Sequence, residues 1–467
     1  MNSSSQEGED KKQVTEIKTY PVPFALGENQ ENISIISNTP TKPSKEQIIN
    51  RAFKFHSQGN ILEAEKLYQY FINQGFNDHR VFSNYGSILK SLSKLQDAEL
   101  CLHKAIELNP AYANAHYNLG NVLKDLGKLQ DAELSYRKAI DLNPTFANAH
   151  YNLGNILKDL GKLQDAELSM RKAIEIKPDY ANAHANLGNI LKNLGKLQDA
   201  ELCLHKAIEL NPALAKGYFS LSTLICSNKS KRWKDRLFSQ SILNNKSQVE
   251  QIDIYFARAN ILHKEKKYEQ SAKYLELANK IKLGLKKSKA DLLINKSKVL
   301  LIESNTKGIN QEEDTSSPES IFIVGMFRSG STLLESILSM NINVNDLGEI
   351  NILEESFIEN KENNNGLTLA ELYGQKANDK NNKLNITTNK WLYNYQYAGI
   401  IASRIPNAKI IHCYRNPLDN ILSIYRSHFA NGNEYSSSLI DCSRVYLDQE
   451  DLMTEYKNRF RSKIYDF

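Results

Sequence analysis

The sequence is poor in the residues that turn, cross-link or anchor a chain. Of its 467 residues, 32 are glycine or proline, about 7% where about 12% is usual. So few turn residues favour long helices and argue against an all-β sandwich or a collagen-like chain. The five cysteines are scattered without a C-x-x-C pair, so neither a zinc site nor a disulfide framework is indicated.

No apolar run approaches the ~18–20 residues that cross a bilayer. The N-terminal residues also lack the apolar core of a signal peptide. We therefore expect a reduced, cytoplasmic protein with no membrane partner. The net charge is only +5, with 59 basic and 54 acidic side chains, and this balance gives no reason to expect a nucleic-acid partner.

A repeat of 34 residues occupies the middle of the chain. Its markers are a glycine, an alanine and a proline that each recur at that spacing: Gly86, Gly120, Gly154 and Gly188; Ala98, Ala132, Ala166 and Ala200; Pro110, Pro144, Pro178 and Pro212. The pattern resembles the tetratricopeptide repeat, a helix–turn–helix unit of this length. Small residues suit the close crossing of two helices, and proline suits the end of the second helix.

The pattern divides the chain into four parts. Residues 1–44 are polar and are expected to form a disordered tail. Repeats cover 45–285, a helix and a polar linker cover 286–317, and strand-then-helix pairs follow over 318–467. We therefore predict an all-α tetratricopeptide superhelix followed by an α/β, P-loop-like domain with a mostly parallel sheet.

The segment IFIVGMFRSGSTLLESIL predicts a strand, a glycine-rich turn and a helix. Gly325 and Gly330 have the spacing of a phosphate loop, in which backbone amides and the helix N-terminus bind an anion. The lysine of nucleotide triphosphatases is absent, because Ser331 and Thr332 follow Gly330 directly. The nearest cation is Arg328, so an ATPase or GTPase is disfavoured. Taken alone, the segment also fits a glycine-rich turn with no ligand.

This loop resembles the 5′-phosphosulfate loop of sulfotransferases that use 3′-phosphoadenosine 5′-phosphosulfate (PAPS). A second signature, NAKIIHCYRNPLDNILSIYRSHF, resembles the family's 3′-phosphate motif. The whole pattern is similar to a bacterial family that joins tetratricopeptide repeats to a sulfotransferase domain, and the transferase part is similar to protein-tyrosine sulfotransferases. The resemblance implies a sulfotransferase-type fold and a set of PAPS-binding residues: Arg328, Ser329, Gly330, Ser331, Thr332, Arg415 and Ser423.

The resemblance also implies the catalytic residues. Glu349 matches the general base of the tyrosine-sulfating relatives, and Lys390 and Arg328 match cations that stabilise the developing charge. No metal is implied. Two alternatives stay open, since Glu349 could begin the next helix, where negative charge is favoured, and Lys390 could be a solvated lysine. His412 lies in an apolar strand and is expected to be a core residue.

The sequence departs from the family pattern at three places. Phe327 and Leu392 stand where the family usually has proline, so a less rigid loop is expected. The family pattern continues with a strand, helices and a closing loop after the final KIYDF. We therefore expect a domain that is incomplete at its C-terminus, with an exposed sheet edge.

The repeats also carry recurring asparagines on one predicted helix face: Asn84, Asn118, Asn152 and Asn186, with Asn121, Asn155 and Asn189 three residues further on. An asparagine ladder on the concave surface could hydrogen-bond a protein, peptide or glycan acceptor. The alternative is a set of polar surface residues copied by duplication.

Together these features predict transfer of a sulfuryl group from PAPS to a hydroxyl of an acceptor recruited by the repeats. Peptide tyrosine, a glycan and a small alcohol all remain open as acceptors. The alternative is a repeat scaffold that carries an inactive, truncated sulfotransferase remnant. A glycosyltransferase is disfavoured because it would leave both anion-binding signatures unexplained.

Overall fold

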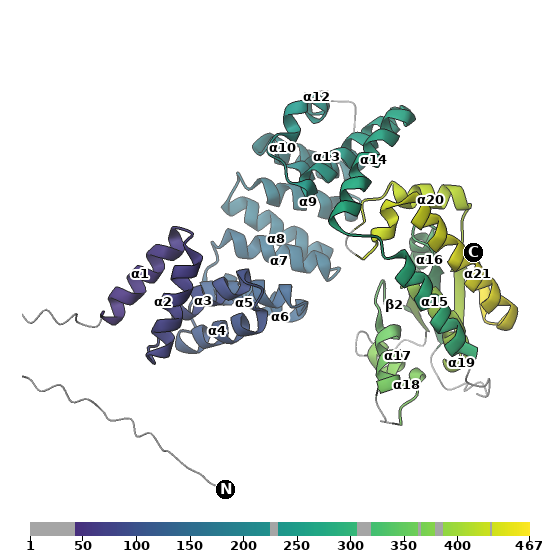
Figure 1. Ribbon diagram of the computed structural model, residues 1–467, viewed down its shortest axis with the longest axis horizontal. Coiled ribbons are helices and arrows are strands. Elements are labelled where there is room, and N and C mark those ends of the chain that lie inside the picture. The colour runs from purple at the N-terminus through teal and green to yellow at the C-terminus, as the bar shows by residue number, and fades with distance from the viewer. Residues whose placement is uncertain (1–42, 225–231, 306–318, 363–365, 379–385, 430–431) are drawn as a thin grey trace, which may run out of the picture. The chain divides into compact units, whose positions relative to one another are not determined.

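The computed structural model describes residues 43–224, 232–305, 319–362, 366–378, 386–429 and 432–467 (Figure 1). The expected disordered tail and most of the polar linker therefore lie outside the described residues. The chain falls into two compact units, Met1–Asn77 and Asp78–Phe467, which are described separately below. No helix in the described ranges is both long enough and apolar enough to cross a membrane.

The first unit contains one helix pair, α1 (Lys45–Ser57) and α2 (Ile61–Asn73). A capping box starts α1, because the Ser44 hydroxyl accepts from the Gln47 amide while the Gln47 side chain accepts from the Ser44 amide. Ile49, Tyr68 and Phe71 are fully buried between the helices. The first part of the predicted repeat region thus folds as a helical hairpin.

The second unit begins with stacked helix pairs whose bounds follow the 34-residue period. They are α3 (His79–Ser91), α4 (Leu95–Leu108), α5 (Ala113–Asp125), α6 (Leu129–Leu142), α7 (Ala147–Asp159), α8 (Leu163–Ile176), α9 (Ala181–Asn193) and α10 (Leu197–Leu210). The less regular α11 (Ala215–Thr223), α12 (Arg232–Phe238), η1 (Gln240–Leu243), α13 (Gln248–Lys264) and α14 (Tyr268–Leu285) follow.

The repeated glycine has a packing reason. A Cβ at Gly120 would lie 2.7 Å from Cε1 of the fully buried Tyr136, so the two helices of the hairpin could not approach as closely with any larger residue. A Cβ added at the equivalent Gly154 would lie 3.0 Å from Cε of Met170. The prediction that small residues mark the helix crossings is therefore explained by direct contacts between paired helices.

The C-terminal part of the second unit is built on a five-stranded parallel sheet of order β2-β3-β1-β4-β5. The strands are β1 (Glu319–Gly325), β2 (Val344–Asp346), β3 (Ile386–Asn389), β4 (Ala408–Cys413) and β5 (Ile464–Asp466). The helices are α15 (Ala290–Asn305), α16 (Ser331–Leu338), α17 (Ile352–Glu362), α18 (Leu369–Asn378), η2 (Leu392–Tyr397), α19 (Ala398–Arg404), α20 (Pro417–Tyr425), η3 (Glu434–Ser437) and α21 (Leu439–Arg459). The predicted fold class, a tetratricopeptide superhelix followed by an α/β domain with a parallel sheet, is confirmed.

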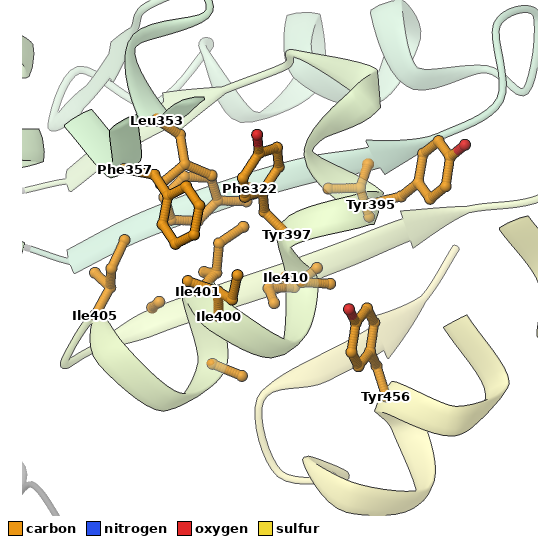
Figure 2. Close-up of a cluster of buried hydrophobic side chains, with 14 of the residues drawn as sticks. Phe322, Leu353, Phe357, Tyr395, Tyr397, Ile400, Ile401, Ile405, Ile410 and Tyr456 are labelled. Carbon is orange, nitrogen blue, oxygen red and sulfur yellow. The ribbon is translucent and has the colours of Figure 1, made fainter. Parts of the chain in front are cut away.

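The core of this domain lies between the sheet and the helices η2, α19 and α21. Phe322 of β1 and Ile410 of β4 meet Ile400 and Ile401 of α19 and Tyr456 of α21 in one buried cluster (Figure 2). This apolar layer packs the centre of the sheet against the helices, and the loops that leave the carboxyl ends of β1, β3 and β4 start from this packed core.

The last residues of the chain form β5, which pairs with β4 from Ile410↔Ile464 to His412↔Asp466. The sequence predicts an exposed sheet edge at this end of the chain. β5 covers the flank of β4 and is itself the edge strand of the described sheet. The expectation of further family segments stays a prediction.

Candidate active site

The phosphate loop joins β1 to α16 at the middle of the sheet. Gly325 ends β1 with φ +140°, and a Cβ there would lie 2.3 Å from the Cys413 carbonyl oxygen of the neighbouring β4. Arg328 and Gly330 also have positive φ, at 69° and 107°. These turns direct the chain so that α16 begins at Ser331 with its first, unpaired amides at the loop.

A cavity of about 390 Å³ lies on this loop. It is lined by Arg328, Ser329, Gly330, Ser331, Thr332 and Arg415. The Ser329 hydroxyl is buried and has no partner within the described structure, which suits a group that awaits an anionic ligand. The predicted loop residues and the predicted Arg415 thus line a single cavity, although their sequence positions are far apart.

Aromatic packing holds the loop where the family pattern has proline. The Phe327 ring packs against Tyr393 and Phe429, with ring centroids 5.5 and 5.2 Å away. The Phe327 carbonyl accepts a hydrogen bond of 3.0 Å from the buried Asn420 side chain on α20. Tertiary contacts therefore restrain the backbone that the sequence analysis expected to be less rigid.

The second predicted anion motif follows β4. Asn416 caps α20 by accepting from the amides of Leu418 and Asp419, and Arg415 precedes this cap as an exposed side chain. Ser423, two turns along α20, accepts a hydrogen bond of 3.3 Å from Nε of Arg328. Since β1 and β4 are parallel neighbours, their carboxyl ends bring the two motifs to one edge of the sheet.

Lys390 lies on the other side of the loop, directly after β3. It is only 5% exposed, and its ammonium lies 3.2 Å from Thr332 Oγ1, 2.8 Å from Glu335 Oε2 and 3.1 Å from Glu349 Oε1. Burial opposes its charge, but the hydrogen bond and charge of Glu335, followed by those of Glu349, raise the pKa of Lys390 above its usual value. Lys390 is therefore a charged, buried lysine, and the alternative of a solvated lysine is excluded.

Glu349 meets this ammonium from the loop between β2 and α17. Its side chain is 56% exposed, so one oxygen pairs with Lys390 while the carboxylate remains open to solvent. It does not begin a helix, since α17 starts at Ile352. The structure thus brings Glu349 and Lys390 together at the N-terminus of α16, whereas Arg328 turns the other way, toward Ser423.

Glu335 is a member of this group that the sequence analysis missed. It is 6% exposed. Burial raises the pKa of its carboxyl to about 7, because the lowering effect of Lys390 is outweighed by burial and by a further contribution from Asp346. The signal available in the sequence was an acidic residue one turn after Ser331, among the apolar residues of the predicted helix and next to Leu334. A charged residue on the buried face of a helix needs a partner, and that partner is Lys390.

His412 is a core residue, as expected. It is fully buried and accepts a hydrogen bond of 2.6 Å from the Gln449 side chain at Nε2. Burial lowers the pKa of His412 to about 4, so the ring is neutral at physiological pH.

The asparagine ladder forms hydrogen bonds between neighbouring repeats. Asn152 donates to Asn121 Oδ1 at 2.8 Å, Asn186 donates to Asn155 Oδ1 at 2.7 Å, and Asn118 donates to Ser83 Oγ at 3.2 Å. These side chains therefore have a structural use that the sequence analysis did not consider.

In the described part of the chain, no cluster of three His, Cys, Asp or Glu side chains is arranged to hold a metal ion.

Family models match both parts of the chain. Tetratricopeptide-repeat models match residues 86–127, 120–161, 154–195, 181–214 and 252–283, and the model described as "Sulfotransferase family" matches residues 365–467. The sulfotransferase match includes Lys390, Arg415 and Ser423, while the phosphate loop lies N-terminal to it.

Similar proteins cover part of the chain. An "Uncharacterized protein" of Aquifex aeolicus (strain VF5) is 27% identical over 169 residues, which are 31% of this chain and 22% of that protein. This chain thus spans less than a quarter of that relative's length. A crystal structure of MamA is 26% identical with a TM-score of 0.33 and covers 35% of this chain and 96% of that one. The structure of YrrB, titled "a TPR protein with an unusual peptide-binding site", is 23% identical with a TM-score of 0.33 and covers 43% of this chain and 97% of that one.

The fold and the family matches define the class: a tetratricopeptide-repeat protein that carries a sulfotransferase-family domain. In this chain the matched repeats precede the matched sulfotransferase-family segment, and that segment indicates a transferase.

Proposed function

We propose that this chain transfers a sulfuryl group from PAPS to a hydroxyl of an acceptor bound by the repeats. The observation that carries the proposal is the position of the Lys390 ammonium, 3.2 Å from Thr332 of the phosphate loop and 3.1 Å from Glu349. This arrangement puts a buried cation and a solvent-open carboxylate at the end of a cavity suited to an anion.

The donor would lie along the carboxyl edge of the sheet. The amides at the start of α16, the Ser329 hydroxyl and Arg328 would hold the 5′-phosphosulfate, while Arg415 and Ser423 would hold the 3′-phosphate. A guanidinium offers a planar fork of donors that matches a phosphate. The orphaned Ser329 hydroxyl and the absence of a described ion pair for Arg328 or Arg415 support this assignment.

The acceptor hydroxyl would approach from the β3 side. Its oxygen attacks sulfur, the bond between sulfur and the 5′-phosphate oxygen breaks, and Glu349 takes the hydroxyl proton. Lys390 stabilises the charge that develops on the leaving oxygen. The products are a sulfate ester and 3′-phosphoadenosine 5′-phosphate (PAP), and no metal takes part.

The repeats would contribute the acceptor-binding surface. Because Asn118, Asn152 and Asn186 already bond across repeats, a protein, peptide or glycan would compete with those bonds at the predicted ladder. A second row of asparagines lies four positions before these residues, and its members are exposed: Asn114, Asn148 and Asn182. We therefore propose that the acceptor contacts this exposed row first.

Calorimetric titration of the full chain with PAP tests the proposal. We expect saturable binding, and Arg415→Ala should weaken it by about tenfold or more because a charge-assisted hydrogen bond to phosphate is lost. Arg444→Ala is the matched control, since that arginine of α21 pairs with Asp291 of α15 and Asp441 of α21 and does not line the loop cavity. A folded chain that does not bind PAP would refute the proposal and favour the inactive-scaffold alternative.

A further inference from the structure

A second cavity, of about 580 Å³, lies between the last repeats and the transferase domain. Its walls come from α9, α11 and α13 on one side and from the phosphate loop and α20 on the other. The lining residues are Lys192, Phe219, Ser222, Thr223, Asn260, His263, Lys264, Arg328, Ser423, Arg426, Ser427 and His428. Arg328 lines this cavity and the loop cavity alike.

The lining is strongly cationic. It includes Lys192, Lys264, Arg328 and Arg426 together with two histidines, and no carboxylate belongs to the described lining. One of the lining histidines, His428, pairs with Asp253 at 3.1 Å. Burial lowers the pKa of both Lys192 and Arg426, as expected for cations that are partly withdrawn from solvent.

Direct contacts hold the walls of this cavity together. The His428 ring stacks on Phe256 of α13 at 4.7 Å, and Asn279 of α14 donates to the Tyr425 carbonyl of α20 at 3.1 Å. Lys282 of α14 donates to the Phe429 carbonyl at 3.3 Å. The repeat wall is thus attached to α20 next to the residue proposed for the 3′-phosphate, Ser423.

The repeat that faces this cavity differs from its near-identical copies at one informative position. In two preceding repeats the equivalent lysine is followed by aspartate, and Lys158 lies 3.0 Å from Asp159. At the cavity the pair is Lys192 and Asn193. The copy that lines the cavity therefore keeps the cation and lacks the neighbouring carboxylate, and the Lys192 ammonium bonds only the Thr223 hydroxyl, at 3.2 Å, among its described contacts.

We infer that the repeat domain supplies one wall of the donor-nucleotide site, with Lys192 and its neighbours binding the phosphate group on the 3′ side of the nucleotide. This inference rests on the proposed function and adds repeat residues to the donor site. The sheet order supports the donor over the acceptor as the ligand. Lys390 and Glu349 lie on the β3 side of the loop, whereas α20 and this cavity follow β4 on the opposite side.

Calorimetry with two probes tests the inference on the full chain. PAP carries the 3′-phosphate and 5′-AMP lacks it, so a residue that binds this group affects PAP alone. We expect Lys192→Met to weaken PAP binding by about tenfold and to change AMP binding less than twofold. Lys158→Met, at the equivalent position of the preceding repeat, is the matched control and should change neither.

Asn193→Asp is a second variant. It introduces aspartate, the residue found at the equivalent position of two preceding repeats, Asp125 and Asp159. The new carboxylate next to Lys192 should weaken PAP binding several-fold while the exposed site keeps the fold intact. Wild-type PAP affinity in both Lys192→Met and Asn193→Asp, together with a loss in Arg415→Ala, would overturn the inference and leave the proposed function standing. Failure of the wild-type chain to bind PAP would overturn both.

Discussion

Replacing Lys390 by methionine should make the stability of the transferase domain more sensitive to alkaline pH. The Lys390 ammonium is the cation 2.8 Å from the buried Glu335 carboxylate. Without it, Glu335 keeps its burial and its acidic neighbour Asp346, both of which raise the pKa of its carboxyl. The variant should therefore hold a proton on Glu335 to a higher pH than the wild type does.

The size of the effect follows from proton linkage. A carboxyl whose pKa is raised by folding binds protons more tightly in the folded state, so the free energy of unfolding falls as pH rises between the unfolded and the folded pKa. For wild-type Glu335 this window runs from 4.5 to about 7. In the variant the window extends above pH 7, where stability falls by up to about 1.4 kcal/mol per pH unit. Between pH 7 and pH 8.5 the variant should lose up to about 2 kcal/mol more than the wild type.

Urea unfolding at a series of pH values measures this difference. The chain has two tryptophans, Trp233 in the repeats and Trp391 beside Lys390, so a Trp233→Phe background makes fluorescence report the transferase domain. The control is Lys390→Met combined with Glu335→Gln, which has no carboxylate to titrate and should lose the additional pH dependence. Parallel pH profiles for Lys390→Met and its parent would refute the assigned ion pair.

Two further predictions concern the repeats and the donor site. Gly120→Ala should lower the free energy of unfolding of the repeats by about 1–3 kcal/mol, because the new methyl meets the rigid Tyr136 ring at 2.7 Å. Gly154→Ala should change the same free energy by less than about 1 kcal/mol, because the Met170 side chain can move and alanine favours helix. Equal losses in urea unfolding would contradict this account. PAP affinity should be the same with Mg²⁺ and with a chelator, because the loop lacks the lysine of nucleotide triphosphatases and no metal-binding cluster occurs in the described ranges. Calorimetry measures both affinities. A loss of affinity on chelation would count against the phosphosulfate assignment.

The sequence was sufficient for the features that depend on local order. The 34-residue spacing of Gly120 and its equivalents predicts helical hairpins because each unit repeats the same short-range contacts. The glycines and hydroxyls around Arg328 predict an anion loop for the same reason, since the loop and the helix N-terminus are contiguous in the chain. The identity of Glu349 and Lys390 as site residues came from family resemblance and stays a prediction; the structure places the two side chains 3.1 Å apart.

Only the tertiary structure decided which side chains share an environment. Glu335 joins Lys390 because β3 lies beside β1, and Arg328 turns to Ser423 because β4 lies on the other flank. The asparagine amides bond between repeats because successive units stack in register. The cationic cavity at Lys192 requires α20 to pack against α13 and α14. Charge and hydrogen-bond partners act over a few ångströms, and residues that are distant in sequence reach that distance only through the order of the strands and the packing of the helices.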